Sequence, residues 1–310
     1  MSSALPTQPN MHVRRGAQFI VLISVILPPL ALATVMWLTW NTGFNIIDLS
    51  LFFGMYLLCG YGITIGFHRY FSHKSFDCPR WVKIFLGISG SMAVQGNLFW
   101  WVAVHRKHHK HSDEDDDPHS PHAGHGGRIR KFLYSHFGWL FDIQDPGEAR
   151  FVPDLMKDPD LRFVSRMFPV WVVISMLIPT VLGGVLTGTW FGALTGFLWG
   201  GLVRVFFEHH VTWSINSVCH IWGAQPYDSH DHSRNNVVFG VLALGEGWHN
   251  NHHAFPTSAR HGLKWWQFDT SWLIIKTMSL VGMATKVKTP SQDRLARAAT
   301  NASNKTSSET

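Results

Sequence analysis

Charged residues are scarce in this chain of 310 residues: aspartate, glutamate, lysine and arginine together make up 15%, about as much as the aromatic residues at 14%. The apolar residues are concentrated in blocks, which disfavours a soluble fold. The 15 tryptophans are typical of side chains at membrane interfaces. Cysteine is also scarce: Cys59, Cys78 and Cys219 are scattered and form no CxxC pair. Neither a disulfide framework nor a zinc ribbon is therefore indicated, and we expect reduced thiols.

Four apolar segments are long enough to cross a bilayer, whose hydrocarbon core needs about 20 residues of helix. Proline inside such segments is tolerated as a kink. The segment that follows the polar residues 1–18 is longer than the apolar part of a signal peptide and lacks a small-residue cleavage site. We therefore predict an all-α integral membrane protein with two helical hairpins, whose membrane helices span approximately Phe19–Trp40, Ile46–Phe67, Phe168–Thr187 and Trp190–Val211.

The basic residues indicate how these helices are oriented. Of the 26 lysines and arginines, two precede the first helix, 14 lie between Arg69 and Arg166, and nine follow residue 211. The two short hairpin loops contain none. Under the positive-inside rule, both termini and the long central segment face the cytoplasm. The net charge of +6 thus bears on membrane orientation, and no nucleic-acid partner is expected.

The remaining segments form a predicted helical cytoplasmic cap, residues 68–167 and 212–288, within a single domain of residues 19–288. The apolar stretch Trp81–Val104 is interrupted by polar residues and is interpreted as one amphipathic or re-entrant helix at the cytoplasmic interface. The polar segment Lys110–Arg130 is predicted to be a loop. Residues 289–310, rich in Ser, Thr, Asn, Lys and Ala, are predicted to be a disordered tail.

Histidine is abundant, and nine of the 20 histidines stand in three short motifs and one single position. They are His68 and His73 in HRYFSH, His105, His108 and His109 in HRKHH, His249, His252 and His253 in HNNHH, and His220. Helix positions i, i+3 and i+4 share one face, so each HxxHH can direct its imidazoles toward one point. The spacing of HRYFSH separates its histidines by about 140° on an ideal helix, so we expect them where a helix ends and the chain bends. Asn216 lies one turn before His220 on the same face.

This density of imidazoles predicts a metal site, because neutral imidazole is the commonest protein ligand for iron, zinc, copper and nickel. Eight or nine imidazoles are too many for one ion, so a dinuclear site is expected. The lack of thiolates and clustered carboxylates disfavours structural zinc and an iron–sulfur cluster, but iron, copper and zinc all remain compatible with imidazole.

The other eleven histidines are interpreted as structural. Among them His209 and His210, beside Glu208, are the candidates to support ligand histidines from outside. The run Asp113–Asp117 is interpreted as a solvated loop, with the alternative that one of its carboxylates orients a ligand histidine.

The motifs HRYFSH, HRKHH, TWSINSVCH and GEGWHNNHH, in this order between about Gly62 and Pro256, resemble the membrane fatty acyl desaturases of the stearoyl-CoA Δ9 type. The resemblance implies two non-haem iron ions that use O2 and two electrons to convert a saturated acyl chain into one with a cis double bond, at Δ9. It also implies that the nine histidines ligate iron and that Asn216 holds a metal-bound water. How the nine divide between two ions does not follow.

The same resemblance implies an internal tunnel for the acyl chain, with a bend at the metals and a closed end that limits chain length. Ordinary packing is the alternative role for the residues concerned. The bend positions match Gln95, Trp101, Thr212 and Trp213, and the closed end matches Tyr56 and Gly60, which are one helical turn apart.

The chain also departs from the animal members of that family. They carry an Arg-Asp pair that contacts the CoA head group, and the matching positions here are Ala103 and Val104. The carrier of the acyl chain therefore stays open among CoA, acyl carrier protein and a glycerolipid. No His-Pro-Gly-Gly motif occurs, so no fused cytochrome b5 domain is expected. We expect a separate donor of the ferredoxin, cytochrome b5 or flavoprotein reductase type, and a bacterial cell membrane as the location.

Two rival functions are compatible with histidine-rich membrane proteins. A related diiron hydroxylase or ketolase acting on alkyl or lipid substrates would share the first hydrogen abstraction, and product mass would distinguish it. A zinc transporter would place ionisable ligands within its helices near the bilayer midplane. Here the candidate ligands lie at helix ends and in the cap, which disfavours a transporter.

Overall fold

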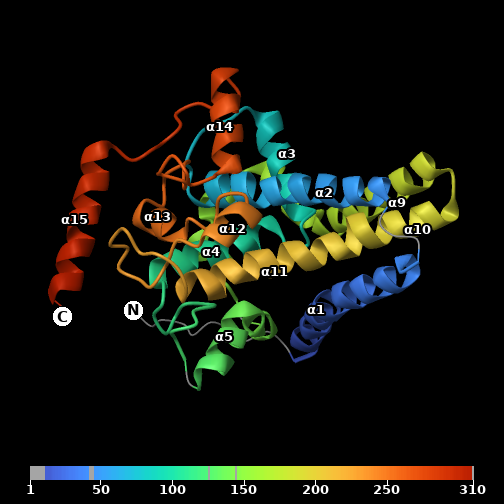
Figure 1. The fold of residues 1–310 in the computed structure, drawn as a ribbon, viewed down its shortest axis with the longest axis horizontal. Coiled ribbons are helices and arrows are strands. Elements are labelled where there is room, and N and C mark those ends of the chain that lie inside the picture. Colours follow the sequence, from blue (N-terminus) through green and yellow to red (C-terminus); the bar gives the residue numbers. More distant parts are fainter. Residues whose placement is uncertain (1–10, 42–44, 125, 144, 309–310) are drawn as a thin grey trace.

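The computed structural model describes residues 11–41, 45–124, 126–143 and 145–308, and this part of the chain is all-α (Figure 1). Three isolated β-bridges join loops, and the three cysteines are free thiols, as predicted. The helices are α1 (Met11–Thr39), α2 (Ile46–Tyr61), η1 (Gly62–Ser72), α3 (Arg80–Ser91), α4 (Leu98–His111), α5 (Arg128–His136), η2 (Gly138–Phe141), α6 (Glu148–Phe151), α7 (Pro153–Met156), α8 (Pro159–Arg166), α9 (Phe168–Thr187), α10 (Trp190–Gly196), η3 (Phe197–Val203), α11 (Arg204–Ser217), η4 (Val218–His220), α12 (Val237–Leu242), α13 (His249–Ala254), α14 (Thr270–Leu280) and α15 (Gln292–Ser308).

The four predicted membrane helices are confirmed as helices long and apolar enough to cross a bilayer: Arg15–Thr39, Ile46–Ser72, Phe168–Thr187 and Trp190–His220. The second and the fourth continue beyond their predicted ends, because η1 extends α2 and because α10, η3, α11 and η4 form one continuous rod. Large apolar side chains are exposed along these helices, for example Val185 and Trp190. Such a surface is expected where lipid replaces water.

The α9–α10 hairpin is held together by close backbone contact. A Cβ atom built on Gly183 would lie 2.3 Å from the carbonyl oxygen of Gly192, and one built on Gly196 would lie 2.3 Å from that of Pro179. Small residues are common at such interfaces because lipid provides no hydrophobic drive for association and dispersion contacts must supply it. Any larger side chain at Gly183 or Gly196 would force the two helices apart.

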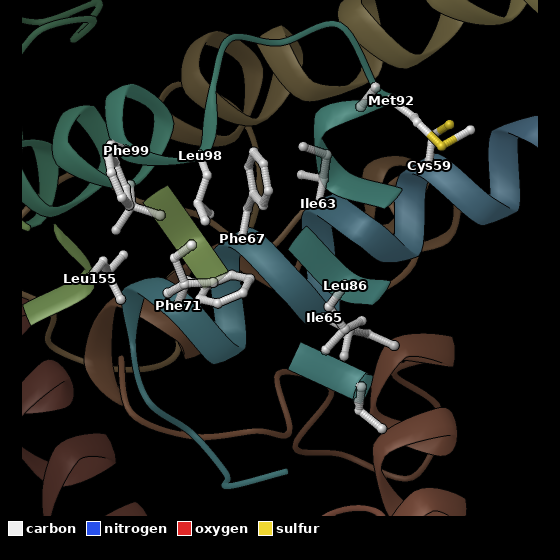
Figure 2. Packing of buried hydrophobic residues seen from close by; sticks show 14 of the residues in the cluster. Cys59, Ile63, Ile65, Phe67, Phe71, Leu86, Met92, Leu98, Phe99 and Leu155 are labelled. Atoms are coloured by element: carbon white, nitrogen blue, oxygen red, sulfur yellow. The ribbon is translucent and has the colours of Figure 1, made fainter. Parts of the chain in front are cut away.

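The main apolar cluster lies between η1, α3 and α4 and positions the first two histidine motifs relative to each other (Figure 2). Phe67 and Phe71 of η1 are buried against Leu86 of α3 and Leu98 of α4. Phe67 immediately precedes His68, and α4 carries the HRKHH motif. The packing of this cluster therefore fixes the separation between the two motifs.

The interpretation of Trp81–Val104 as one helix is wrong: the segment contains nearly all of α3 and the first half of α4. α3 ends at Ser91, and the chain turns through Val94 and Gly96, whose φ angles are 62° and 101°. Asn97 then caps α4, because its side chain accepts hydrogen bonds from the amides of Phe99 and Trp100. The turn redirects the chain so that α4 brings its histidines back toward η1.

The segment 289–310, predicted to be a disordered tail, instead contains a helix. α15 covers Gln292–Ser308, and its Arg294 guanidinium lies 5.7 Å from the centre of the Phe255 ring, directly after α13. Alanine and arginine have high helix propensity, which the many Ser, Thr and Asn residues of this segment concealed.

Candidate metal centre

The first motif converges because the second membrane helix ends in a π-helix. In η1 the amide of His73 donates a hydrogen bond to the carbonyl oxygen of His68, 3.2 Å away, which is the i→i+5 bond of a π-helical turn. Residues five apart then return to the same face, and the two ring centroids lie 4.9 Å apart. The helix end expected at this motif is present, since His73 is its C-cap.

The other two motifs lie on α4 and α13, and the three histidines of each motif belong to two different groups. His105 and His109 point toward one centre while His108 joins another, and His249 and His253 separate in the same way from His252. The expectation that each HxxHH aims at one point is therefore wrong. On a helix the i+3 and i+4 positions lie about 60° and 40° to opposite sides of position i, so two adjacent centres can share one motif.

The nine predicted histidines thus form two adjoining groups, each with its ligand atoms within 4.8 Å of one another. The five-histidine group contains His68, His73, His105, His109 and His252, and the four-histidine group contains His108, His220, His249 and His253. The motifs alone do not show how the nine histidines divide into groups, whereas the distances between their ligand atoms do.

Distances within each group match those between neighbouring ligands of one ion. The Nε2 atoms of His73 and His105 lie 2.8 Å apart, and those of His68 and His252 lie 3.0 Å apart. Two nitrogens at about 2.1 Å from a common ion and at right angles to each other would be separated by about 3 Å.

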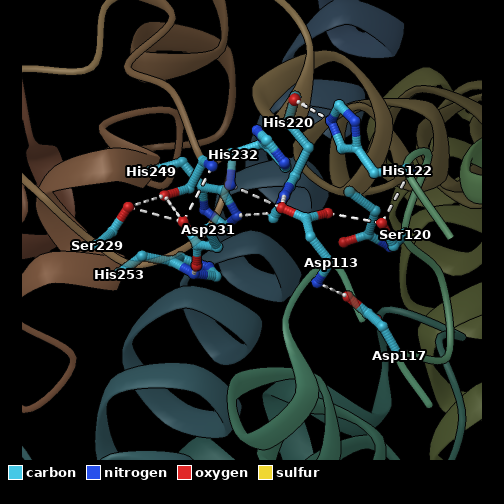
Figure 3. Close-up of polar contacts among 12 residues, drawn as sticks. Asp113, Asp117, Ser120, His122, His220, Ser229, Asp231, His232, His249 and His253 are labelled. Carbon is cyan, nitrogen blue, oxygen red and sulfur yellow. Dashed lines mark hydrogen bonds and ion pairs between the residues drawn. The ribbon is translucent and has the colours of Figure 1, made fainter. Parts of the chain in front are cut away.

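Carboxylates on the far side of the rings determine which nitrogen carries the proton (Figure 3). His108 Nδ1 lies 3.0 Å from both carboxylate oxygens of Asp117, and His253 Nδ1 contacts Asp231. When both rings are neutral, each Nδ1 donates to its carboxylate, so the two Nε2 atoms present lone pairs to each other at 3.4 Å. Two facing lone pairs repel, and a cation between them removes the conflict. The donor set therefore fits a metal ion.

Two further histidines are supported in the same way. His220 Nδ1 lies 2.9 Å from Asp113 Oδ2, and His68 Nδ1 contacts Glu246. Asp113 and Asp117 belong to the segment interpreted as a solvated loop, and their contacts with His108 and His220 favour the alternative that one of its carboxylates orients a candidate ligand histidine. Asp231 and Glu246 were missed as partners, because only the fold brings them to the rings.

Neutral imidazole is the form that binds metal, and burial favours it at several of these rings, whereas the Asp117 carboxylate outweighs burial at His108 and raises its pKa. Desolvation, reinforced by the neighbouring histidines, lowers the pKa of His105, His109 and His252 well below the ordinary value. The opposite holds for their carboxylate partners: burial would raise the pKa of Asp117, but the charge and hydrogen bond of His108 outweigh burial and hold that pKa far below its usual range.

A buried ion network stabilises the support of His68. The Arg69 guanidinium is completely buried and lies 3.1 Å from Glu246 and 3.0 Å from Asp269. His261 Nδ1 lies 3.2 Å from the same Glu246 carboxylate. This arrangement satisfies a charge that would be costly to bury alone.

The predicted supporting role of His209 and His210 is wrong. His209 Nε2 bonds to the carbonyl oxygen of Ala93 at 3.2 Å, and His210 Nδ1 faces His136 Nε2 at 3.0 Å. Both rings lie on α11, which precedes His220 in the fourth candidate span. His119 and His261, interpreted as structural, instead lie beside the two groups.

Two cavities meet at the histidines. The inner cavity extends from Tyr56 and Gly60 to His68, His105, His108 and His249. The outer cavity extends from the same region to α1 and η2. Both are lined by Gln95, Trp101, His105, Thr212 and Asn216, and Trp213 lines the outer one.

The junction of the cavities is held by polar contacts between distant segments. Gln95 Nε2 donates to Thr212 Oγ1 at 2.9 Å, and Trp101 Nε1 donates to Gln95 Oε1 at 3.4 Å. The residues matched to a bend thus lie together beside the histidines, and those matched to a closed end lie at the opposite extreme of the inner cavity.

Comparison with known proteins identifies related sequences over most of this length. The sequence model of the fatty acid desaturase family matches residues 48–279. The chain is 40% identical over 270 residues to a hex-5-enoyl-[acyl-carrier protein] acetylenase of Moorena producens, covering 86% of this chain and 84% of the relative.

Other relatives of similar identity act on other carriers. An sn-1 stearoyl-lipid 9-desaturase of Anabaena variabilis is 41% identical over 233 residues, or 74% of this chain and 79% of the relative. An acyl-CoA C20 Δ5-desaturase of Anemone leveillei is 42% identical over 245 residues, or 77% of this chain and 73% of the relative.

Proposed function

This chain belongs to the fatty acid desaturase family, and from this premise we propose that it introduces a cis double bond, at Δ9, into a saturated acyl chain with O2 as co-substrate. The observation that carries the proposal is the pair of facing Nε2 atoms of His108 and His253, 3.4 Å apart, among nine buried or half-buried histidines at the junction of two cavities. Two non-haem iron ions held by these histidines would supply the O2 activation that attack on an unactivated methylene requires.

Each group of histidines has its own place in this proposal. The five-histidine group holds one iron and the four-histidine group the other, with Asn216 completing the smaller set through a hydrogen-bonded water. Asn216 lines both cavities, and His108 and His249 line the inner one with it, which supports this role. The carboxylates on the Nδ1 atoms orient the rings and keep the protons away from the metal side.

The remaining residues of the cavities orient the substrate. We propose that the methyl half of the chain occupies the inner cavity, with Tyr56 and Gly60 at its closed end, and that the carboxyl half occupies the outer cavity. Gln95, Trp101, Thr212 and Trp213 would then bend the chain at the histidines and limit the access of bulk water to the reacting carbons. The distance from the outer mouth to the bend would set the double-bond position.

Orientation and electron supply complete the proposal. The basic residues between the second and third spans support a cytoplasmic location for the cap and both termini, and a bacterial cell membrane is the proposed location. A separate ferredoxin, cytochrome b5 or flavoprotein reductase would deliver two electrons at a groove lined by His73, His109 and His253, beside Lys110.

Expression in a host that has no oxygen-dependent route to Δ9 products tests the function. Wild type should bind about two irons per chain and yield new monounsaturated acids only when O2 is present. His108→Ala should lose both, whereas His111→Ala, three residues further along α4 and in neither group, should retain both. Hydroxylated products would assign the chain to the hydroxylases. Bound zinc without a lipid change would refute the proposal.

A further inference from the structure

His73 lies where the second candidate span ends, and its own helix does little to fix the direction of its ring. It is the C-cap of η1, and the last carbonyl groups of a helix have no partner within that helix. The chain also turns directly after it, since Lys74 has a φ of 51°. His73 is only half-buried, whereas His68 of the same motif is buried. Contacts from outside η1 must therefore hold this ring in place.

Arg106 supplies such contacts by satisfying the two carbonyl groups that directly precede His73. Its Nη2 donates to the carbonyl oxygen of Phe71 at 2.6 Å, and its Nε donates to that of Ser72 at 3.1 Å. Arg106 itself directly follows His105 in α4. One side chain thus joins the residues before His73 to the residue after His105, and the Nε2 atoms of these two histidines lie 2.8 Å apart.

The other donors of Arg106 hold the guanidinium itself in place. Nη1 donates to the carbonyl oxygen of Phe151 and to Asp154 Oδ1, both at 2.7 Å, and Nη2 donates to Asp154 Oδ2 at 3.1 Å. A guanidinium carries five N–H groups in a rigid plane, and here each of them has an acceptor. Any rotation of this group would therefore break several hydrogen bonds at once.

Asp154 is also connected to the other flank of His73. Lys74 Nζ lies 2.7 Å from Asp154 Oδ2, so the residues on both sides of His73 contact the same ion pair. Burial would raise the pKa of Asp154, but the hydrogen bonds of Arg106 and Lys74 outweigh burial and hold that pKa well below its usual range. The carboxylate is therefore charged at physiological pH. It belongs to α7, in a segment that contains none of the histidine motifs.

General stabilisation of the fold is the alternative role for this ion pair. The side chains of Arg106 and Asp154 keep 18% and 31% of their exposed surface, and partly exposed ion pairs contribute little to stability. What their contacts share is a common destination: they end at the residues immediately before and after His73. This convergence favours a role in placing one ring.

We propose that Arg106 and Asp154 form a clamp that positions His73 against His105 and so completes the five-histidine group around its iron. This inference rests on the proposed function, which assigns one iron to that group. Arg106 is a positioning residue, because its guanidinium donates to backbone carbonyls and to Asp154 rather than to a ligand ring. The four-histidine group contains no residue of η1. Loss of the clamp should therefore change the surroundings of one iron and spare those of the other.

The test loads the full chain with iron enriched in the Mössbauer isotope and compares Arg106→Lys with wild type. Lysine keeps the charge but places its three donors on a single atom, so it cannot serve the carbonyls and the carboxylate together. We expect about two irons per chain in both proteins, with the Mössbauer signal of one iron changed and that of the other as in wild type. Retention of iron against a competing chelator should weaken on the order of tenfold.

A second variant and a matched control accompany this measurement. Asp154→Asn removes the charge that faces the guanidinium and leaves its three carbonyl acceptors, so we expect the same iron to change by a smaller amount. Arg80→Lys is the control: Arg80 donates to both oxygens of Asp160, at 2.8 and 2.6 Å, in an ion pair of the same kind between α3 and α8. It should leave both signals and iron retention as in wild type.

The outcomes separate this inference from the proposed function. Two signals equal to those of wild type in a folded Arg106→Lys would overturn the clamp. An equal change of both signals would also overturn it, because it would indicate a general disturbance of α4. If thermal unfolding shows that Arg106→Lys does not fold, Asp154→Asn decides, and unchanged signals there would overturn the clamp. Wild type that binds no iron would overturn the proposed function and, with it, the inference.

Discussion

The closed end of the inner cavity should determine which acyl chains are accepted, and Gly60 is the position where the cavity can be shortened most directly. A Cβ atom built on Gly60 would lie 2.9 Å from Leu244 Cδ1 and 3.7 Å from Glu208 Oε1. All three residues line the inner cavity. A larger side chain at position 60 therefore extends into the space proposed for the methyl end of the substrate.

The size of the effect follows from helix geometry. Gly60 precedes His68 by eight residues and Tyr56 precedes it by twelve, which at 1.5 Å per residue places them roughly 12 Å and 18 Å from the metal end of the cavity. A phenyl ring at position 60 would then remove about 6 Å of cavity, the length of about four or five methylene groups. We predict that Gly60→Phe prefers chains about four carbons shorter than wild type, and that Gly60→Ala, which only requires the Leu244 methyl to move, shows a smaller shift.

Competition among saturated substrates of different length, followed by gas chromatography of the products, measures this preference. Gly54→Phe is the matched control, since Gly54 lies on the same helix, is exposed, and would place its Cβ within 4 Å of no other atom. Overpacking costs roughly 1–3 kcal/mol, so thermal unfolding in detergent should accompany the assay. A folded Gly60→Phe with the product profile of wild type would refute the assignment of Tyr56 and Gly60 to the closed end.

Two further predictions concern the groups behind the histidines. Asp231→Asn removes the carboxylate that holds His253 Nδ1, and retention of iron against a competing chelator should weaken about 10- to 100-fold; unchanged retention would contradict an orienting role. Arg69→Met leaves Glu246 and Asp269 buried without their cation and should destabilise the fold by roughly 3–5 kcal/mol. A melting temperature equal to that of wild type would show that those carboxylates are neutralised in another way.

The membrane spans could be predicted from sequence because a bilayer imposes a length and a composition on any helix that crosses it. The gathering of the nine histidines could be predicted because imidazoles clustered in this way have few other uses. Neither argument depends on knowing which residues meet in space, and both kinds of residue lie where they were expected: the spans as helices, the histidines as two compact groups.

What could not be predicted depends on backbone details and on long-range contacts. The π-helical turn that aligns His68 with His73 has no distinctive composition, and an ideal helix would have separated them. Asp113 and His220 are 107 residues apart in the chain, so no local pattern connects them. The turn between α3 and α4 depends on Val94 at a φ of 62°, a conformation that its β-branched side chain disfavours and that only tertiary packing can impose.

The division of HxxHH between two centres explains why this site requires two copies of the motif. In each motif the i and i+4 histidines belong to one group and the i+3 histidine to the other, but the assignment is reversed: α4 contributes two ligands to the five-histidine group, and α13 contributes two to the four-histidine group. Each group is therefore built from both helices, and neither could form on one helix alone.

The two helices are positioned by different contacts. The packing of η1 and α3 positions α4, whereas α13 is positioned by Asn250 and Asn251, which bond to Tyr227 and Asn235. A shift of either helix would therefore alter both groups at once. The two ions would be acquired and lost together, and the acyl chain at the cavity junction would meet a centre whose two halves keep a constant separation.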